Sequence, residues 1–145
     1  MIELLIVFVV FGLVVMMSIR SVGDTLRRDK ASKAASILGS DIEQAFAIAA
    51  RQRTPVMMIL DRANRKISII DRGTTTKIYR QRSFSKTSDY GVDSLYANRD
   101  TIVIMPNGIA TSAWDLRLRF TSTGGTVYTK KVNASVGGMV RVDNR

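Results

Sequence analysis

The carboxylate of Glu3 stands at the edge of a long apolar run, and this position implies chemistry more clearly than any other in the sequence. From Leu4 to Ile19 there is no charge, and the one polar side chain is Ser18. A carboxylate at the hydrocarbon edge of a membrane costs about 2–3 kcal/mol or more unless it is neutralised or partnered. It could snorkel into lipid headgroups, or pair with a cation on a neighbouring subunit, for which the α-amino group of Met1 is the obvious source.

The groups that commonly serve catalysis are missing. The sequence has no cysteine and no histidine, which excludes thiolate chemistry, disulfides and a histidine base. It contains no GxxxxGK or GxGxxG phosphate-binding motif and no metal-ligand cluster. Asp89, Asp93 and Asp100 do not have the spacing of an EF-hand loop, so a solvated loop is favoured over a calcium site. We therefore expect no enzyme, cofactor or metal.

Basic residues form two groups, which could contact phosphates or could simply make a solvated basic surface. The net charge is +10, and residues 54–145 carry 15 basic and 7 acidic groups, so most of the excess lies in the C-terminal part. One group surrounds Tyr79 and the other lies near the C-terminus. Together they comprise Lys77, Arg80, Arg82, Lys130, Lys131, Arg141 and Arg145.

The first structural element that would position these residues is the apolar run at the start of the sequence. Residues 2–19 would form a helix about 27 Å long, close to the hydrocarbon thickness of a bilayer. A cleaved signal peptide is a poor fit, because the run lacks a basic n-region and a small-residue cleavage site. A buried soluble helix is also a poor fit, because the run is apolar on all sides. We expect residues 1–19 to be a transmembrane helix.

Residues 20–53 are expected to continue this helix as an amphipathic segment. Acid-before-base pairs four residues apart, Asp24 with Arg28 and Asp29 with Lys33, are typical of a solvated helix surface. A stripe at helical spacing is expected to pack on a sheet, and Ile37 and Ile48 beside it could widen this core face or contact a neighbour. The stripe is Ala31, Ala34, Ala35, Leu38, Ile42, Ala45, Phe46 and Ala49.

After Pro55 the hydrophobic period changes to two, which predicts an antiparallel β domain over residues 54–145. The fold class is therefore α+β, with one long N-terminal helix packed on antiparallel strands. We expect strands at 56–60, 66–70, 77–84, 101–105, 114–121, 126–134 and 139–142. Turns that need positive φ are expected at Asn107–Gly108, Gly124–Gly125 and Gly137–Gly138. Residues 85–100 have the least pattern and are expected to be a surface loop.

Three segments resemble one family of filament proteins. Residues 1–7, MIELLIV, resemble the IELLIV core of type IV pilins and pseudopilins, and Gly12 follows Glu3 by nine residues, where that family often has glycine. Residues 45–56, AFAIAARQRTPV, resemble the helix end and first strand of the GspH/FimT branch of minor pilins. Residues 102–108, IVIMPNG, resemble the hydrophobic strand and Pro-x-Gly of that branch. The resemblance covers nearly the whole chain.

The sequence departs from the family pattern at its start. The acid is third and not fifth, and no basic leader or cleavage glycine precedes it, so we expect either a start assigned too late or a different mature terminus. Arg20 replaces a frequent proline, so no break is expected there. Basic residues after the span would by themselves place the C-terminal domain in the cytoplasm. An additional basic leader would restore the outward orientation.

The resemblance implies a structural subunit of a type IV pilus-like filament or type II secretion pseudopilus. Met1, Glu3 and Gly12 would serve assembly with other pilin subunits. The chain would cross the bacterial inner membrane once, with its C-terminal domain outside the cytoplasm, until polymerisation machinery moves it into an extracellular or periplasmic filament. N-terminal methylation is also implied.

The alternative is a minor pilin that binds extracellular DNA for uptake through a basic C-terminal surface. The DNA-capturing members of the branch carry a C-terminal Gly-Arg-x-Arg motif. The matching residues here, 138–141, read GMVR and have only one of the two arginines.

Overall fold

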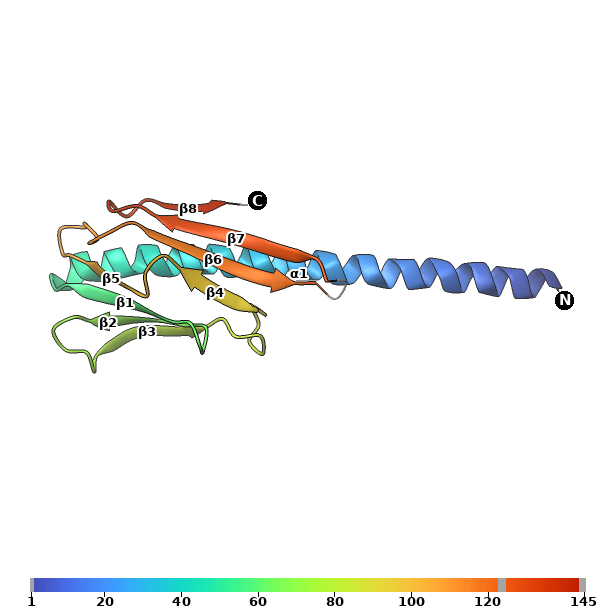
Figure 1. The fold of residues 1–145 in the computed structure, drawn as a ribbon, viewed down its shortest axis with the longest axis horizontal. Helices are drawn as coiled ribbons and strands as arrows, with labels where there is room; N and C mark the ends of the chain where they lie inside the picture. Colours follow the sequence, from blue (N-terminus) through green and yellow to red (C-terminus); the bar gives the residue numbers. More distant parts are fainter. Residues whose placement is uncertain (1, 123–124, 144–145) are drawn as a thin grey trace.

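One helix, α1 (Ile2–Gln52), runs through more than a third of the chain. The structure is a computed structural model that describes residues 2–122 and 125–143, with the side chains of residues 17–22 left outside the description. At 1.5 Å per residue α1 is about 77 Å long. Figure 1 shows that its C-terminal half lies against the strands while its N-terminal half projects beyond them.

The helix ends where the sequence predicts. Arg53 adopts the left-handed conformation, with φ of 55°, which is a common way for a helix to terminate. Pro55 follows two residues later, and the residue before a proline avoids the α region. The chain can therefore turn directly from the helix into the first strand.

Within the described residues, eight strands follow and form two four-stranded antiparallel sheets, with orders β3-β2-β1-β5 and β4-β6-β7-β8. Both sheets lie along the same part of α1, with β3 and β8 at the outer edges (Figure 1). The strands are β1 (Val56–Asp61), β2 (Lys66–Asp71), β3 (Ile78–Ser83), β4 (Ser94–Ala97), β5 (Thr101–Ile104), β6 (Trp114–Thr121), β7 (Val127–Ala134) and β8 (Val140–Asp143).

The core lies between α1 and the sheets. The predicted alanine-rich stripe is buried, except that Phe46 is partly exposed and packs against the rest. Alanines allow the strands to approach the helix closely. Trp114 is fully buried at the start of β6, and its indole N–H donates a hydrogen bond of 2.7 Å to the carbonyl of Arg99. Ile48 packs against this core, whereas Ile37 is half-exposed.

Glycine is required where the turn between β7 and β8 meets the helix. Gly138 has φ of +83°, which is unfavourable for other residues. A Cβ atom at this position would also lie 3.1 Å from a ring carbon of Phe46. Positive φ also occurs at Gly108 and Gly125, as predicted for their turns, while Gly124 lies outside the described residues.

The prediction of a surface loop over residues 85–100 is wrong. Residues 94–97 form β4, which pairs antiparallel with β6. Val92 and Leu95 are buried in the core, so this segment closes one edge of the second sheet. A strand of four residues with one fully buried side chain is too short to produce a readable alternation, which is why the sequence gives no signal for it.

The two predicted ion pairs on the helix surface are also absent from the described residues. Asp24 instead accepts a hydrogen bond from the hydroxyl of Ser122. Arg27 donates a hydrogen bond to the carbonyl oxygen of Thr121. These two contacts attach α1 to the end of β6, at the point where the helix leaves the β domain.

Candidate functional site

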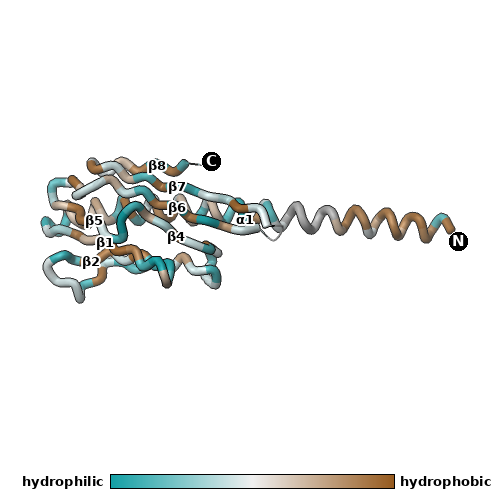
Figure 2. Tube along the Cα trace, viewed as in Figure 1, coloured by the Kyte–Doolittle hydropathy of each residue, from teal (hydrophilic) through white to brown (hydrophobic). Residues whose placement is uncertain are grey.

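The most unusual surface is the projecting part of α1, residues 2–16, which we call the stem. Each of its large hydrophobic side chains is between 40% and 75% exposed. Figure 2 shows this hydrophobic run at the N-terminal end of the helix, away from the strands. Soluble monomers rarely expose apolar patches larger than a few hundred Å². The stem is therefore a surface that needs a partner.

Glu3 is exposed in the first turn of the stem and makes no ion pair with any described residue. An acid in the first turn interacts favourably with the helix dipole, so the helix tolerates its charge. Gly12 has open space around the position of an added Cβ. Met1, the third predicted assembly residue, lies outside the described residues.

The sequence predicts a transmembrane helix over residues 1–19, which includes the stem. Among the residues that the structure describes, no helix combines the length and the apolar character needed to cross a membrane.

Two of the predicted phosphate-binding cations are held by a buried acid. Asp41 on α1 is 3% exposed and forms a two-point ion pair with Arg82, at 2.6 and 3.2 Å. Arg80 contacts the same carboxylate at 3.1 Å. Arg82 also donates a hydrogen bond of 2.7 Å to the hydroxyl of Tyr90. The hydrogen bond to Asp41 raises the pKa of Arg82, against the opposing effect of its partial burial.

This cluster fastens α1 to β3, the outer strand of the first sheet. Because both arginines are engaged by one buried carboxylate, these residues serve the helix–sheet contact more than a ligand. Sequence analysis missed this role, since nothing in the helix stripe distinguished Asp41 from an exposed acid.

Lys77 stands just before β3, with its amino nitrogen 4.9 Å from the ring centroid of Tyr79. This is a cation–π contact. Tyr79 in turn donates a hydrogen bond of 2.8 Å to Asp71. Lys77 is exposed, but it directly precedes a strand of the first sheet, whereas the C-terminal cations lie on the second sheet.

Asp71 organises the turn between β2 and β3. Its carboxylate accepts hydrogen bonds from the hydroxyl of Tyr79 and from the backbone N–H groups of Thr74 and Gly73, at 2.8, 3.1 and 2.8 Å. These bonds, led by that from Tyr79, hold the pKa of Asp71 below its ordinary value of 3.8. A depressed folded-state pKa means that the ionised group stabilises the fold above the unfolded value, and that this contribution disappears as pH falls through the folded value.

We accordingly expect Asp71→Asn to lower the melting temperature at neutral pH. The difference from the parent should shrink below about pH 4, where the parent carboxylate also becomes protonated. Thermal unfolding, followed by circular dichroism at several pH values between neutral and acidic, measures this difference in melting temperature. Asp89→Asn, at an exposed loop position, is the matched control and should change little. A destabilisation by Asp71→Asn that stays constant across this range would contradict the role of the ionised group.

The C-terminal cations do not form one surface. Lys130 is 8% exposed and stands opposite Leu118, so it lies on the face of β7 that is turned toward the core. Lys131 and Arg141 lie on the opposite face of the same sheet. Arg145 lies outside the described residues.

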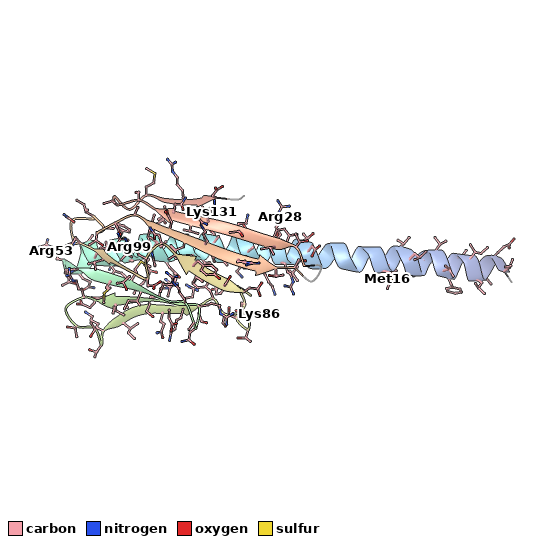
Figure 3. The ribbon with its side chains drawn as sticks, viewed as in Figure 1. Met16, Arg28, Arg53, Lys86, Arg99 and Lys131 are labelled. Carbon is pink, nitrogen blue, oxygen red and sulfur yellow. The ribbon has the colours of Figure 1, made fainter. Side chains whose placement is uncertain are left out.

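The structure assembles a different group of cations on that outer face. Arg117 is opposite Lys131 in the pairing of β6 with β7, and Arg119 follows two residues along β6 on the same face. Arg141 lies on β8 beside Asn133 of β7. We call Arg117, Arg119, Lys131 and Arg141 the basic face; in the described structure none of them forms an ion pair. Figure 3 shows Lys131 on this sheet.

The basic face also carries an aromatic ring. Tyr96 is 51% exposed and stands opposite Arg117 on the other side, in the pairing of β4 with β6. Both residues border a shallow groove of about 370 Å³. The alternation of buried and exposed residues along β6 makes Arg117 and Arg119 solvent-facing, but only the register between strands brings them beside Lys131 and Tyr96.

A long helix that projects from an antiparallel β domain and packs its second half on the strands defines the type IV pilin-like fold. The sequence itself matches no known family model and no curated protein.

Two solved structures have this fold and are similar to the chain. One is the type IV minor pilin FimU of Pseudomonas aeruginosa, with a TM-score of 0.62 and 14% identity, over 80% of this chain and 90% of that one. The other is the minor pseudopilin EpsH from the type 2 secretion system of Vibrio cholerae. Its TM-score is 0.61 with 12% identity, over 79% of this chain and 97% of that one.

Proposed function

We propose that this protein is a structural subunit of a type IV pilus-like filament or a secretion pseudopilus, and not an enzyme. The observation that carries the proposal is the stem, whose hydrophobic side chains are exposed on all sides. The β domain covers only the second half of α1, and a domain of this size cannot cover the remainder. Similarity to a minor pilin and a minor pseudopilin supports assembly as the purpose of the stem.

In this proposal the stem is buried first in a membrane and then among the stems of other subunits. The apolar run Leu4–Ile19 first holds the subunit in the bacterial inner membrane, with the β domain outside the cytoplasm. Polymerisation machinery then transfers the stem into a bundle of stems from other pilin or pseudopilin subunits, in an extracellular or periplasmic filament. Both environments remove the apolar side chains from water, at about 25 cal/mol for each Å² buried. Glu3 and Gly12, with the N-terminal amine of a neighbour, define how the stems fit together.

Stem-to-stem contact can be tested directly because the chain has no cysteine of its own. We expect Val7→Cys and Val10→Cys, introduced singly into the full chain, to form disulfide-linked dimers under mild oxidation of assembled material. Asn107→Cys, in the exposed loop between β5 and β6, is the control and should remain monomeric. Efficient cross-linking at the loop but not at the stem would refute the proposed packing.

A second candidate function, binding of extracellular DNA, is favoured by the basic face. Like charges directly opposite in a sheet are destabilising, yet Arg117 and Lys131 stand opposite each other. Arg117 and Lys131 stand side by side next to the exposed ring of Tyr96, and cations beside an aromatic ring can bind a nucleic-acid backbone and stack a base. Asp143 stands opposite Lys131 on its other side. This surface replaces the group predicted from the sequence, because Arg80 and Arg82 are paired with Asp41 and Lys130 faces the core.

We expect the full chain in detergent to shift DNA in a gel at low salt if this function is present. Arg117→Ala combined with Lys131→Ala should weaken binding and reduce the slope of log affinity against log salt by about 0.9 for each phosphate contact removed. Arg53→Ala with Arg99→Ala, two exposed arginines at the far end of the β domain, removes equal charge and should have little effect. Absence of any shift at low salt would eliminate this function.

A further inference from the structure

A groove of about 350 Å³ lies where the helix leaves the β domain. Its helix side is made by Gly23, Leu26, Arg27 and Lys30, and its other side includes Lys86 and Phe120. Figure 3 places Arg28, on the same helical turns, and Lys86 at the stem-side end of the β domain. We call this feature the stem groove.

The stem groove combines an apolar surface with positive charge. Leu26 is 55% exposed, although it lies beside the buried Phe120. Arg27 is held by its hydrogen bond to the carbonyl of Thr121, a neutral group that leaves its charge uncompensated. Lys30 makes no ion pair with any residue in the described part of the chain.

Two acids lie at the rim of the stem groove: Asp93 is 3.5 Å from Lys86, and Asp24 accepts a hydrogen bond from the hydroxyl of Ser122. The side chain of Lys86 is nonetheless 71% exposed, so it retains free donors. No acidic side chain is among the described residues that line the groove. An anionic group attached to an apolar body fits this surface, whereas a simple anion would leave Leu26 in water.

The position of the stem groove along α1 indicates which anion this is. A helix needs about 20 residues to cross a hydrocarbon core of about 30 Å, which from Ile2 extends to residue 21. The headgroup layer adds about 5–7 Å, or three to five residues, and so reaches residues 24–26. The helix side of the stem groove, from Gly23 to Lys30, therefore begins within this layer and extends about one turn beyond it when the stem is inserted, a distance that the long side chains of Arg27 and Lys30 can span toward the membrane.

We propose that the stem groove binds the headgroup of an anionic phospholipid while the subunit is in the membrane. The phosphate would meet Arg27, Lys30 and Lys86, and the glycerol region would cover Leu26. This inference rests on the membrane insertion in the proposed function. Its consequence is a fixed height for the β domain above the membrane before the subunit is extracted.

The test uses the full chain with Ser88, which borders the stem groove, replaced by cysteine and labelled with an environment-sensitive fluorophore. The protein is reconstituted in phosphatidylcholine vesicles with increasing fractions of phosphatidylglycerol. We expect the label at position 88 to report a less polar environment as phosphatidylglycerol rises, and a label at Asn107→Cys to report no change. Lys30→Gln, which disturbs no described contact, should raise the half-maximal phosphatidylglycerol fraction by roughly fivefold.

Arg99→Gln, at the opposite end of the β domain in Figure 3, is the matched control and should leave this fraction unchanged. Flotation of the vesicles after alkaline extraction measures stem insertion separately. A chain that inserts but shows no response to phosphatidylglycerol overturns the lipid site alone. A chain that fails to insert overturns both proposals. A signal that depends on protein concentration and not on phosphatidylglycerol means that a neighbouring subunit occupies the groove, and it also overturns the lipid site.

Discussion

Glu3→Gln should abolish filament formation while leaving the β domain folded. In the proposed filament, the carboxylate would lie in apolar surroundings next to the N-terminal amine of a neighbour. Removing its charge leaves that amine without a counter-charge, at a cost of about 2.5 kcal/mol or more. This corresponds to roughly 70-fold weaker association at each subunit contact. Because every subunit added to a filament repeats the contact, the loss is multiplied along its length.

Counting filaments by electron microscopy measures this effect, and the circular dichroism spectrum reports whether the β domain is intact. Glu43→Gln is the matched control, since Glu43 lies exposed on the same helix and far from the stem. It should assemble as the parent does. Normal filaments from Glu3→Gln would remove the acid from the assembly mechanism, and an unfolded β domain would mean that Glu3 acts on the fold instead.

Asp41→Asn should produce the largest loss of stability among single changes to the polar residues of the helix. The substitution leaves Arg82, whose side chain is 21% exposed, without its charged partner at the contact between α1 and β3. Breaking a buried ion pair by removing one partner costs about 3 kcal/mol. For a domain of this size the melting temperature should fall by about 10 °C. Thermal unfolding of the full chain in detergent measures the change.

A double substitution measures how much of this loss of stability comes from the pair of Asp41 and Arg82. Asp41→Asn combined with Arg82→Gln should be less destabilised than the sum of the two single variants, because in the double variant only Arg80, and no longer Arg82, is left without its charged partner. Asp29→Asn, an exposed acid on the same helix, should change the melting temperature little. If Asp41→Asn behaves like Asp29→Asn, the ion-pair cluster does not fasten the helix to the sheet.

The helix and most of the strands could be predicted because their signals are local. The alanine-rich stripe has helical spacing, Pro55 marks the end of the helix, and β6 alternates buried Trp114 and Leu116 with exposed Asp115 and Arg117. These periodicities can be read from the sequence without knowing which residues lie nearby in the fold. β4 was missed because four residues provide no such repeat.

The ligand-facing surfaces could be predicted only in part, because they depend on which strands pair. Arg80 and Lys131 both appear in the sequence as members of basic clusters, yet Arg80 contacts Asp41, 39 residues away, while Lys131 is half-buried beside Arg117 and forms no ion pair among the described residues. Charge counts do not distinguish these cases. Strand register and the position of one helix acid decide which cations are compensated and which are available to a ligand.

The measurement that bears most directly on the account is sedimentation velocity of the full-length protein after detergent is removed. An exposed apolar stem predicts that the protein leaves the monomeric state and forms large assemblies or filaments, since no described part of the chain covers residues 2–16. A stable monomer in plain buffer, with the stem protected from protease, would show that the stem folds against its own β domain. That result would contradict a subunit built for assembly.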